Sequence, residues 1–218
     1  MNRDSVDAKR FKAMYASQPP WDIGRPQKVF VDVAEKVSGP LLDVGCGTGE
    51  NAIFFGKRGL DVLGIDFLEE PIEIAIRKAA HQGLDTVAFK VMDALRLTDV
   101  AHTFHSIIDC GLFHVFNDAD RRTYVEGLAS VLVPDGRLFL LCFSDDEPEG
   151  QGPRRVSRKE IENAFAEGWE IESIEPCRFE VRPDRSDMGF SEGGPRAWFM
   201  MARRAKLLPA HPLKHSTT

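Results

Sequence analysis

Between residues 41 and 143, short apolar runs alternate with amphipathic stretches of helical periodicity. The apolar runs predict strands, and the stretches between them predict helices. A helix between two strands returns the second strand parallel to the first, so the sheet should be mainly parallel and covered on both faces. We expect strands at residues 41–45, 61–66, 87–91, 106–110 and 137–143, and helices at 50–58, 71–83 and 118–132, the last capped by Asp118 or Asp120.

The chain changes character after residue 144, where a polar loop begins. Ser157 and Glu160 then have the spacing of a capping box, which predicts a helix. Two long strands are expected at 169–181 and 196–203, paired as an antiparallel hairpin at one edge of the sheet. The segment between them is rich in Gly, Asp, Ser and Pro, which predicts a mobile loop of active-site size.

The composition excludes several classes of protein. The 218 residues contain 28 Lys and Arg against 34 Asp and Glu, a net charge of −6, whereas nucleic-acid-binding proteins present a basic surface. The longest strongly apolar run, 138–143, is far shorter than the ~20 residues of a membrane-spanning helix, and the N-terminus lacks the pattern of a secretory signal. The four cysteines form no C-x-x-C pair, which predicts reduced thiols and no metal site. We expect a cytoplasmic protein, monomeric or weakly dimeric, with no nucleic-acid or membrane partner.

A glycine-rich loop, Asp43-Val44-Gly45-Cys46-Gly47-Thr48-Gly49-Glu50, follows the first expected strand. Its glycines let the backbone turn sharply and let a ligand approach closely. The spacing is G-x-G-x-G, whereas a dinucleotide fingerprint reads G-x-G-x-x-G. The carboxylate of Asp43 would repel a pyrophosphate and would suit a ligand with an ammonium group.

Two further acids end the next two strands. Asp66 could accept hydrogen bonds from two ribose hydroxyls, and Asp93 could accept one from an adenine amino group. Ligands bind at the carboxyl ends of strands in open α/β sheets. Asp43, Asp66 and Asp93 together therefore indicate one extended adenosyl ligand with a cationic tail.

These motifs, with Asp109-Cys110-Gly111 and Pro134-Asp135-Gly136-Arg137-Leu138 after them, resemble the class I S-adenosylmethionine-dependent methyltransferases in the correct order over about residues 40–143. The resemblance implies an α/β, Rossmann-like, doubly wound sheet of seven strands, mostly parallel with an antiparallel last strand. It also implies that the Gly45–Gly49 loop contacts the methionine moiety. The cofactor-binding set that it implies comprises Trp21, Arg25, Asp43, Gly45, Cys46, Gly47, Gly49, Asn51, Asp66, Phe67, Met92, Asp93, Ala94 and Asp109.

Upstream, Pro20-Trp21-Asp22-Ile23-Gly24-Arg25-Pro26 resembles the P-W-D-x-G segment of the thiol, halide and thiopurine methyltransferase group. In that group the N-terminal segment folds over the cofactor. Trp21 would lie against the sulfonium or adenosyl face, and Arg25 would reach the methionine carboxylate. Alternatively, Trp21 is only a packing anchor. We expect an N-terminal lid and helices at 1–38, a methyltransferase domain at 39–206 and a flexible tail at 207–218.

His114 follows the fourth strand and is the best candidate for a general base, or for a group that only orients the acceptor. Phe113 and Phe116 flank it with surface suited to a planar, apolar substrate. A structural histidine among packing aromatics is the alternative. The expected substrate set comprises Tyr15, Phe113, Phe116, Phe143, Arg154 and Trp198.

The stretches around Phe113-His114-Val115-Phe116, Cys142-Phe143-Ser144 and Gly152-Pro153-Arg154-Arg155 are similar to bacterial methyltransferases that inactivate heterocyclic toxins. The resemblance implies methyl transfer from S-adenosylmethionine to a sulfur, oxygen or nitrogen atom of a small, aromatic or heterocyclic acceptor. Three alternatives stay open: a thiol or halide methyltransferase acting on small nucleophiles, an enzyme that uses a nicotinamide dinucleotide, and a non-catalytic cofactor-binding domain.

Overall fold

The computed structural model describes residues 11–15, 19–150 and 152–206. The expected flexible tail at 207–218 and the start of the expected lid lie outside these ranges. Within them, no helix is both long enough and apolar enough to cross a bilayer.

Seven strands of the described chain form one sheet in the order β3-β2-β1-β4-β5-β7-β6. Only β7 runs antiparallel to its neighbours, so the predicted mixed sheet with an antiparallel last strand is confirmed. The strands are β1 Leu41–Val44, β2 Val62–Asp66, β3 Val87–Val91, β4 Phe104–Cys110, β5 Leu132–Phe143, β6 Trp169–Arg178 and β7 Arg196–Arg204.

The helices lie between the strands as the sequence pattern predicts, and residues 11–15 form a further helical turn. The α-helices are α2 Lys28–Asp32, α3 Glu50–Lys57, α4 Glu69–His81, α5 Asp118–Val131 and α6 Arg158–Ala164. The short 3₁₀ helices are η1 Ala34–Lys36, η2 Ala94–Asp99, η3 Phe113–Val115 and η4 Pro183–Met188.

Two helix starts test the capping predictions. The capping box of Ser157 and Glu160 is present at α6. At α5 the capping prediction is wrong, because the side chain of Asn117 accepts the hydrogen bond from the backbone of Asp120 and is the N-cap. An amide side chain caps a helix as well as a carboxylate does.

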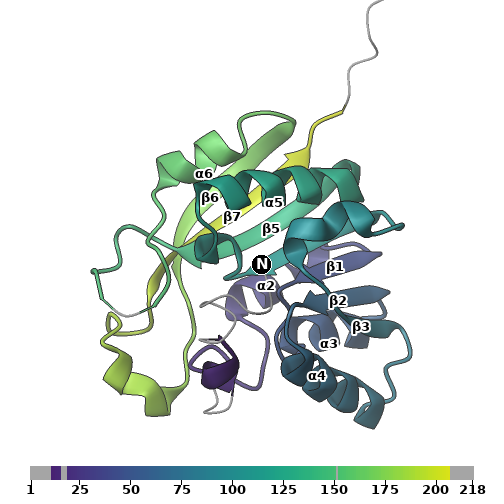
Figure 1. The fold of residues 1–218 in the computed structure, drawn as a ribbon, viewed down its shortest axis with the longest axis horizontal. Coiled ribbons are helices and arrows are strands. Elements are labelled where there is room, and N and C mark those ends of the chain that lie inside the picture. Colours follow the sequence, from purple (N-terminus) through teal and green to yellow (C-terminus); the bar gives the residue numbers. More distant parts are fainter. Residues whose placement is uncertain (1–10, 16–18, 151, 207–218) are drawn as a thin grey trace, which may run out of the picture.

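Alternate residues of the strands enter two hydrophobic cores, one on each face of the sheet. On β5, Leu138 and Leu140 join α5 and α6 in one core, whereas Phe139 and Leu141 join α2 and α3 in the other. Figure 1 shows α5 and α6 together on one face of the sheet. Both faces are thus covered, as near-continuous apolar strands require.

Two segments differ from the sequence-based expectation. The Pro134-Asp135-Gly136 turn lies inside β5, which begins at Leu132, because Asp135 takes a positive φ of 62° and shifts the pairing with β4. The expected mobile loop at 182–195 contains η4. The buried carboxylate of Glu147 accepts hydrogen bonds from the backbone N–H groups of Ser191 and Arg196 and so anchors the second half of this loop.

The strand order reverses at β1, which lies between β2 and β4. The chain leaves β1 toward α3 and leaves β4 toward α5, on opposite faces of the sheet. A crevice opens at the carboxyl ends of two such strands, and ligands bind there in α/β folds. In Figure 1 the turn at 11–15 (dark purple) and the segment around η4 (yellow-green) lie toward the same end of the molecule.

Candidate active site

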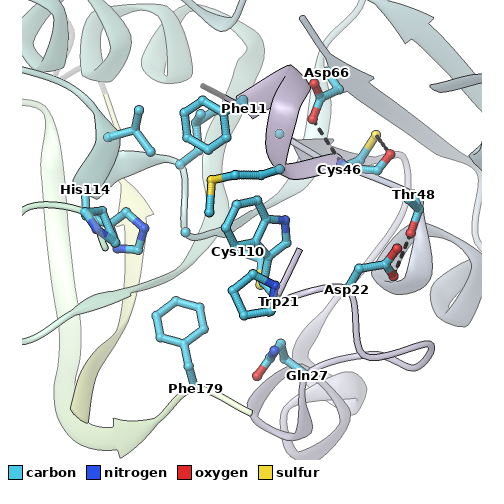
Figure 2. Close-up of a pocket in the computed structure, with 18 of the residues that line it drawn as sticks. Phe11, Trp21, Asp22, Gln27, Cys46, Thr48, Asp66, Cys110, His114 and Phe179 are labelled. Carbon is cyan, nitrogen blue, oxygen red and sulfur yellow. Dashed lines mark hydrogen bonds between the residues drawn. The ribbon is translucent and has the colours of Figure 1, made fainter. Parts of the chain in front are cut away.

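A cavity of about 320 Å³ lies at this crevice. Figure 2 shows Asp66, Cys46 and Thr48 on one side of it and His114 and Phe179 on the other, with Trp21 between them. Sixteen of the predicted site residues line this cavity, and they come from parts of the chain far apart in sequence. They are Tyr15, Trp21, Arg25, Gly45, Cys46, Gly47, Asn51, Asp66, Phe67, Met92, Asp93, Ala94, His114, Phe116, Phe143 and Arg154.

The glycine loop is held against the end of β2. The backbone N–H groups of Gly45 and Cys46 both donate to the carbonyl of Ile65, at 2.8 and 2.9 Å. Asp66 accepts from the backbone N–H of Gly47 at 3.1 Å and from that of Leu68 at 3.0 Å. Burial raises the pKa of Asp66 to about 6, against the opposing effect of these hydrogen bonds. The loop and the carboxylate are therefore one rigid unit.

Asp93 stands beside this unit at the end of β3. Its side chain accepts from the backbone N–H of Leu95 at 3.0 Å and caps η2. Met92 and Ala94 line the cavity on either side of it. Two carboxylates at neighbouring strand ends, with a glycine loop between β1 and α3, match the donor and acceptor set of an adenosyl group.

Asp43 requires a revision, because it is fully buried and does not line the cavity. One carboxylate oxygen accepts from the backbone N–H of Ala52 at 3.1 Å, in the first turn of α3, where a negative charge is favoured. The other oxygen has no hydrogen-bond partner among the described residues. Burial raises the pKa of Asp43 to about 8. Its position supports the loop from below and gives no direct contact with a ligand's ammonium group.

Asp109 and Phe113 are also buried behind the cavity wall. Asp109 accepts from the backbone N–H groups of Leu112 and Phe113 and from the hydroxyl of Tyr124 at 2.8 Å, so it shapes the turn after β4. Phe113 packs on Phe165 inside one hydrophobic core. The predicted ligand contacts of both residues are replaced by structural roles.

Gly49 and Trp198 lie off the cavity as well. Gly49 has a φ of 85°, and a Cβ there would stand 2.8 Å from Phe89 and 2.9 Å from Ala75, so only glycine fits this start of α3. Trp198 donates from Nε1 to the carbonyl of Val156 at 3.1 Å, which ties β7 to the segment before α6. Both support the site from outside.

The N-terminal segment covers the cavity. The Trp21 ring packs edge-on against Phe11 and Tyr15, with centroids 5.9 and 6.2 Å apart, and its Nε1 donates to the Tyr15 hydroxyl at 3.4 Å. The hydroxyl of Tyr15 lies so close to Gly47 that a Cβ there would stand 2.7 Å from it. The turn at 11–15 thus lies directly on the glycine loop.

A polar chain connects this cover to α4. The hydroxyl of Thr48 donates to Asp22 at 3.0 Å and accepts from Lys78 at 2.9 Å, and Lys78 also pairs with Glu50 at 2.6 Å. Asp22 belongs to the Pro20–Pro26 segment, for which the sequence motif predicts a lid. Its contact with the loop residue Thr48 is visible in Figure 2.

Arg25 borders the cavity, but its guanidinium is directed to Glu180, with an ion pair of 2.8 Å. The contact of Arg25 with a methionine carboxylate therefore stays a prediction, which would require the guanidinium to leave Glu180. Gln27, which the sequence reasoning missed, is 4% exposed and lines the same wall. No motif singles out a glutamine, because its place depends on the distant residue Glu180.

An aromatic cluster of His114, Phe143, Phe179 and Phe190 forms the other side of the cavity. The rings of His114 and Phe143 are 5.0 Å apart, those of Phe143 and Phe179 5.1 Å, and those of Phe143 and Phe190 5.7 Å. Arg154 closes its rim and pairs with Asp118 at 2.5 Å. Such walls suit a planar, apolar ligand.

His114 itself is 6% exposed, and its Nδ1 accepts from the backbone N–H of Phe143 at 2.9 Å. Burial, with the nearby cations Arg121 and Arg155, lowers the pKa of His114 to about 3. The imidazole is therefore neutral throughout the physiological range.

Several other residues of the cavity wall were not predicted from the sequence. Phe11 and Met14 share one face of a helical turn with Tyr15, a spacing of three and four residues that could have identified them. Phe179 and Val181 alternate just beyond the end of β6, a strand-like spacing that also carries a signal. Cys110, Leu112, Val115 and Met188 also belong to this group.

Among the residues described, no group of His, Cys, Asp or Glu could hold a metal ion. The residues of the glycine-loop side do fit S-adenosylmethionine. The carboxylates of Asp66 and Asp93 would accept hydrogen bonds from its hydroxyl and amino donors, and backbone groups of the loop would hold its polar tail. When bound, this cofactor supplies a methyl group on a sulfonium centre.

Comparison with known proteins gives the same result. A family model described as a methyltransferase domain matches residues 41–136. The 2-heptyl-1-hydroxyquinolin-4(1H)-one methyltransferase of Mycobacteroides abscessus is 33% identical over 183 residues, which are 82% of this chain and 79% of the relative. The probable thiol methyltransferase 2 of Arabidopsis thaliana is 28% identical over 79% of this chain and 78% of its own.

Solved structures agree. One described as "Conversion of a Disulfide Bond into a Thioacetal Group during Echinomycin Biosynthesis" superimposes with a TM-score of 0.79 at 32% identity, over 90% of this chain and 92% of that one. A methyltransferase from Anabaena variabilis, at 18% identity, shares the fold with a TM-score of 0.71 over 94% of this chain and 96% of that one. The chain belongs to the class I S-adenosylmethionine-dependent methyltransferases.

Proposed function

We propose that this enzyme transfers the methyl group of S-adenosylmethionine to a sulfur, oxygen or nitrogen atom of a small, planar, aromatic or heterocyclic acceptor, in a detoxification-type reaction. The observation that carries the proposal is a cavity with two unlike sides. The glycine loop, Asp66 and Asp93 form the polar side, and the aromatic cluster forms the other.

The dimensions and covering of the cavity support this proposal. A volume of about 320 Å³ is at the lower end of the range for small-molecule sites. The cover formed by Tyr15 and Trp21 would exclude water, which strengthens electrostatic interactions inside and holds the reacting atoms in line. The aromatic cluster would stack a flat ring beside the polar side.

Two relatives indicate the acceptor class by name, one a hydroxyquinolone methyltransferase and the other a probable thiol methyltransferase. The first favours a heterocycle with an acidic hydroxyl, and the aromatic cluster agrees with it. The second supports the alternative of a thiol or halide acceptor. Membership of the methyltransferase family disfavours a nicotinamide dinucleotide.

An acceptor panel tests the proposal. Purified protein is incubated with S-adenosylmethionine and, separately, N-hydroxy heterocycles, phenols, aromatic thiols, aliphatic thiols and halides, and S-adenosylhomocysteine is measured. We expect the highest kcat/KM with aromatic or heterocyclic acceptors. Preference for aliphatic thiols or halides would establish the alternative, and no product in the presence of measured cofactor binding would indicate a non-catalytic domain.

The variant Asp66→Ala serves as the control in this panel, because it should abolish cofactor binding and every methylation with it. The lid role of residues 1–38, the domain at 39–206, a monomeric or weakly dimeric state and a cytoplasmic location stay predictions. Contacts of Tyr15 and Trp21 with the cavity support the lid, and four free cysteines support a reducing compartment.

A further inference from the structure

The two nitrogens of His114 have different surroundings. Nδ1 accepts the hydrogen bond from the backbone N–H of Phe143, a donor that cannot reverse its role. A neutral imidazole carries one proton, on the nitrogen that does not accept. The proton of His114 is therefore on Nε2.

Nε2 is directed toward the cavity. His114 belongs to η3, and a Cβ on Gly111, the residue that follows β4, would stand 3.3 Å from its Nε2; both residues line the cavity. Among the described residues Nε2 has no hydrogen-bond partner. His114 thus offers a hydrogen-bond donor, and no lone pair, to a molecule in the aromatic cluster.

The charges around the ring keep it in this state. Arg121 comes from α5, with its guanidinium 4.4 Å from the Phe113 ring centroid, and Arg155 lies 5.2 Å from that of Phe143. Both cations, together with burial, oppose a charged imidazolium. The carboxylates on this side, Asp118 and Glu160, are paired with Arg154.

Other bases are absent from the described wall near His114. Cys110, at the end of β4, also lines the cavity, and burial raises the pKa of its thiol well above its usual range. The carboxylates that line the cavity belong to its polar side. They are Asp22, Glu50, Asp66 and Asp93.

We infer that the enzyme binds its acceptor as an anion that has already lost its proton. His114 recognises this anion by donating a hydrogen bond from Nε2 and does not act as a base. The inference rests on the proposed function and narrows its substrate class to acidic hydroxyl, thiol or N-hydroxy groups on an aromatic or heterocyclic ring. Arg121 and Arg155, the cations that disfavour an imidazolium, favour a negative charge beside the ring.

The chemistry balances without a base. The acceptor loses its proton to water before binding. An electron pair of its anion then forms the bond to the methyl carbon while the carbon–sulfur bond breaks and its pair stays on sulfur. Two neutral products result, and no proton moves within the site.

The tautomer can be measured without any acceptor. Long-range ¹⁵N–¹H correlation spectra of the S-adenosylhomocysteine complex should show the Nε2–H form of His114, unchanged between about pH 5 and pH 8. The variant His114→Gln assigns the signal. An Nδ1–H tautomer, or titration of His114 in this range, overturns the inference.

Three substitutions separate a donor from a base. In His114→Gln the side-chain amide can still donate near the position of Nε2, so kcat/KM should fall least. In His114→Asn the amide oxygen can still accept from Phe143, but the donor is withdrawn, and kcat/KM should fall about 10- to 100-fold, the value of a hydrogen bond to a charged group. His114→Ala should match Asn, and exposed His105→Gln is the control.

If His114 acted as a general base, kcat/KM would fall as far in His114→Gln as in His114→Asn. If His114 were a base, the midpoint of the acidic limb, where kcat/KM decreases as the pH falls, would also be the same for every acceptor. We expect instead that, across ring-substituted thiophenols and phenols, the midpoint of this limb moves with the pKa of the acceptor. A common midpoint, or equal loss in Gln and Asn, overturns the inference.

Binding of a chromophoric acceptor gives a readout without turnover. A nitrophenol bound to the S-adenosylhomocysteine complex should show the absorbance of its anion below its own pKa in solution. Binding as the neutral form, or no binding, counts against the inference. If the acceptor panel gives no product while the anion is bound, the proposed function fails, and only the binding of an anion by His114 is retained.

Discussion

The side chain of Gln27 is hydrogen-bonded to both backbone groups of Glu180, 153 positions away. Its Nε2 donates to the carbonyl oxygen, and its Oε1 accepts from the N–H, each at 2.8 Å. Gln27 precedes α2 and Glu180 follows β6, and both flanking segments line the cavity. This pair therefore connects the cover of the cavity to its aromatic side.

Gln27→Ala should destabilise the protein by about 1–3 kcal/mol, because it removes two hydrogen bonds and leaves partly buried backbone groups unpaired. Urea denaturation measures this change, and titration with S-adenosylhomocysteine should show weaker binding. Arg25→Ala removes an exposed ion pair with the same Glu180 and should cost less than about 1 kcal/mol. Equal decreases in the free energy of unfolding of the two variants would show that the hydrogen bonds between Gln27 and Glu180 stabilise the protein no more than the exposed ion pair does.

Trp21→Ala should weaken binding of S-adenosylhomocysteine about 10-fold, because the ring holds Phe11 and Tyr15 over the glycine loop, and edge-on aromatic contacts contribute about 0.5–1.5 kcal/mol each. Isothermal titration calorimetry measures the affinity. Trp198→Phe is the matched control, since it loses a hydrogen bond away from the cavity. Trp198→Phe should lower the stability of the protein and leave its affinity for S-adenosylhomocysteine unchanged. Unchanged affinity in Trp21→Ala with reduced affinity in Trp198→Phe would contradict the lid role of Trp21.

Cofactor affinity should depend on pH through Asp66. Its pKa is raised to about 6, so below that pH the carboxyl is protonated and loses an acceptor for hydroxyl donors. The affinity for S-adenosylhomocysteine should therefore fall as the pH drops through about 6, and Asp66→Asn should be weak at every pH. Asp61→Asn, at an exposed position before β2, should behave as wild type. A flat pH dependence in the wild-type protein would contradict this assignment.

The buried acids should make the free protein less stable as the pH rises. The pKa of Asp43 is raised to about 8 and that of Asp109 to about 7, from 3.8, so between about pH 4 and pH 8 the folded state binds more protons than the unfolded state. The free energy of unfolding then falls with increasing pH.

Asp43→Asn should reduce this slope, because each unit of pKa difference corresponds to about 1.4 kcal/mol. The free energy of unfolding, measured in urea across this pH range for both proteins, provides the test. Asp61→Asn again supplies the comparison, as an exposed acid. Parallel slopes for Asp43→Asn and wild type would show that Asp43 does not titrate as described.

The order of the elements and the polar side of the cavity were predictable from sequence. Hydrophobic periodicity and the glycine motif are local signals, and the rules for parallel sheets place the ends of β1, β2 and β3 at one edge. For that reason Gly45, Asp66 and Asp93 are found where the sequence indicated. The antiparallel β7 was implied by the family resemblance and is confirmed by its pairing.

The tertiary structure decided which side chains of these motifs reach the cavity. Asp43 and Asp109 belong to the motifs but point into the protein, because helix starts and turns nearby use their carboxylates. Gln27 and Phe179 reach the cavity through contacts between segments far apart in sequence. The direction of a side chain depends on packing and long-range hydrogen bonds, and the proton of His114 depends on one of them, from Phe143.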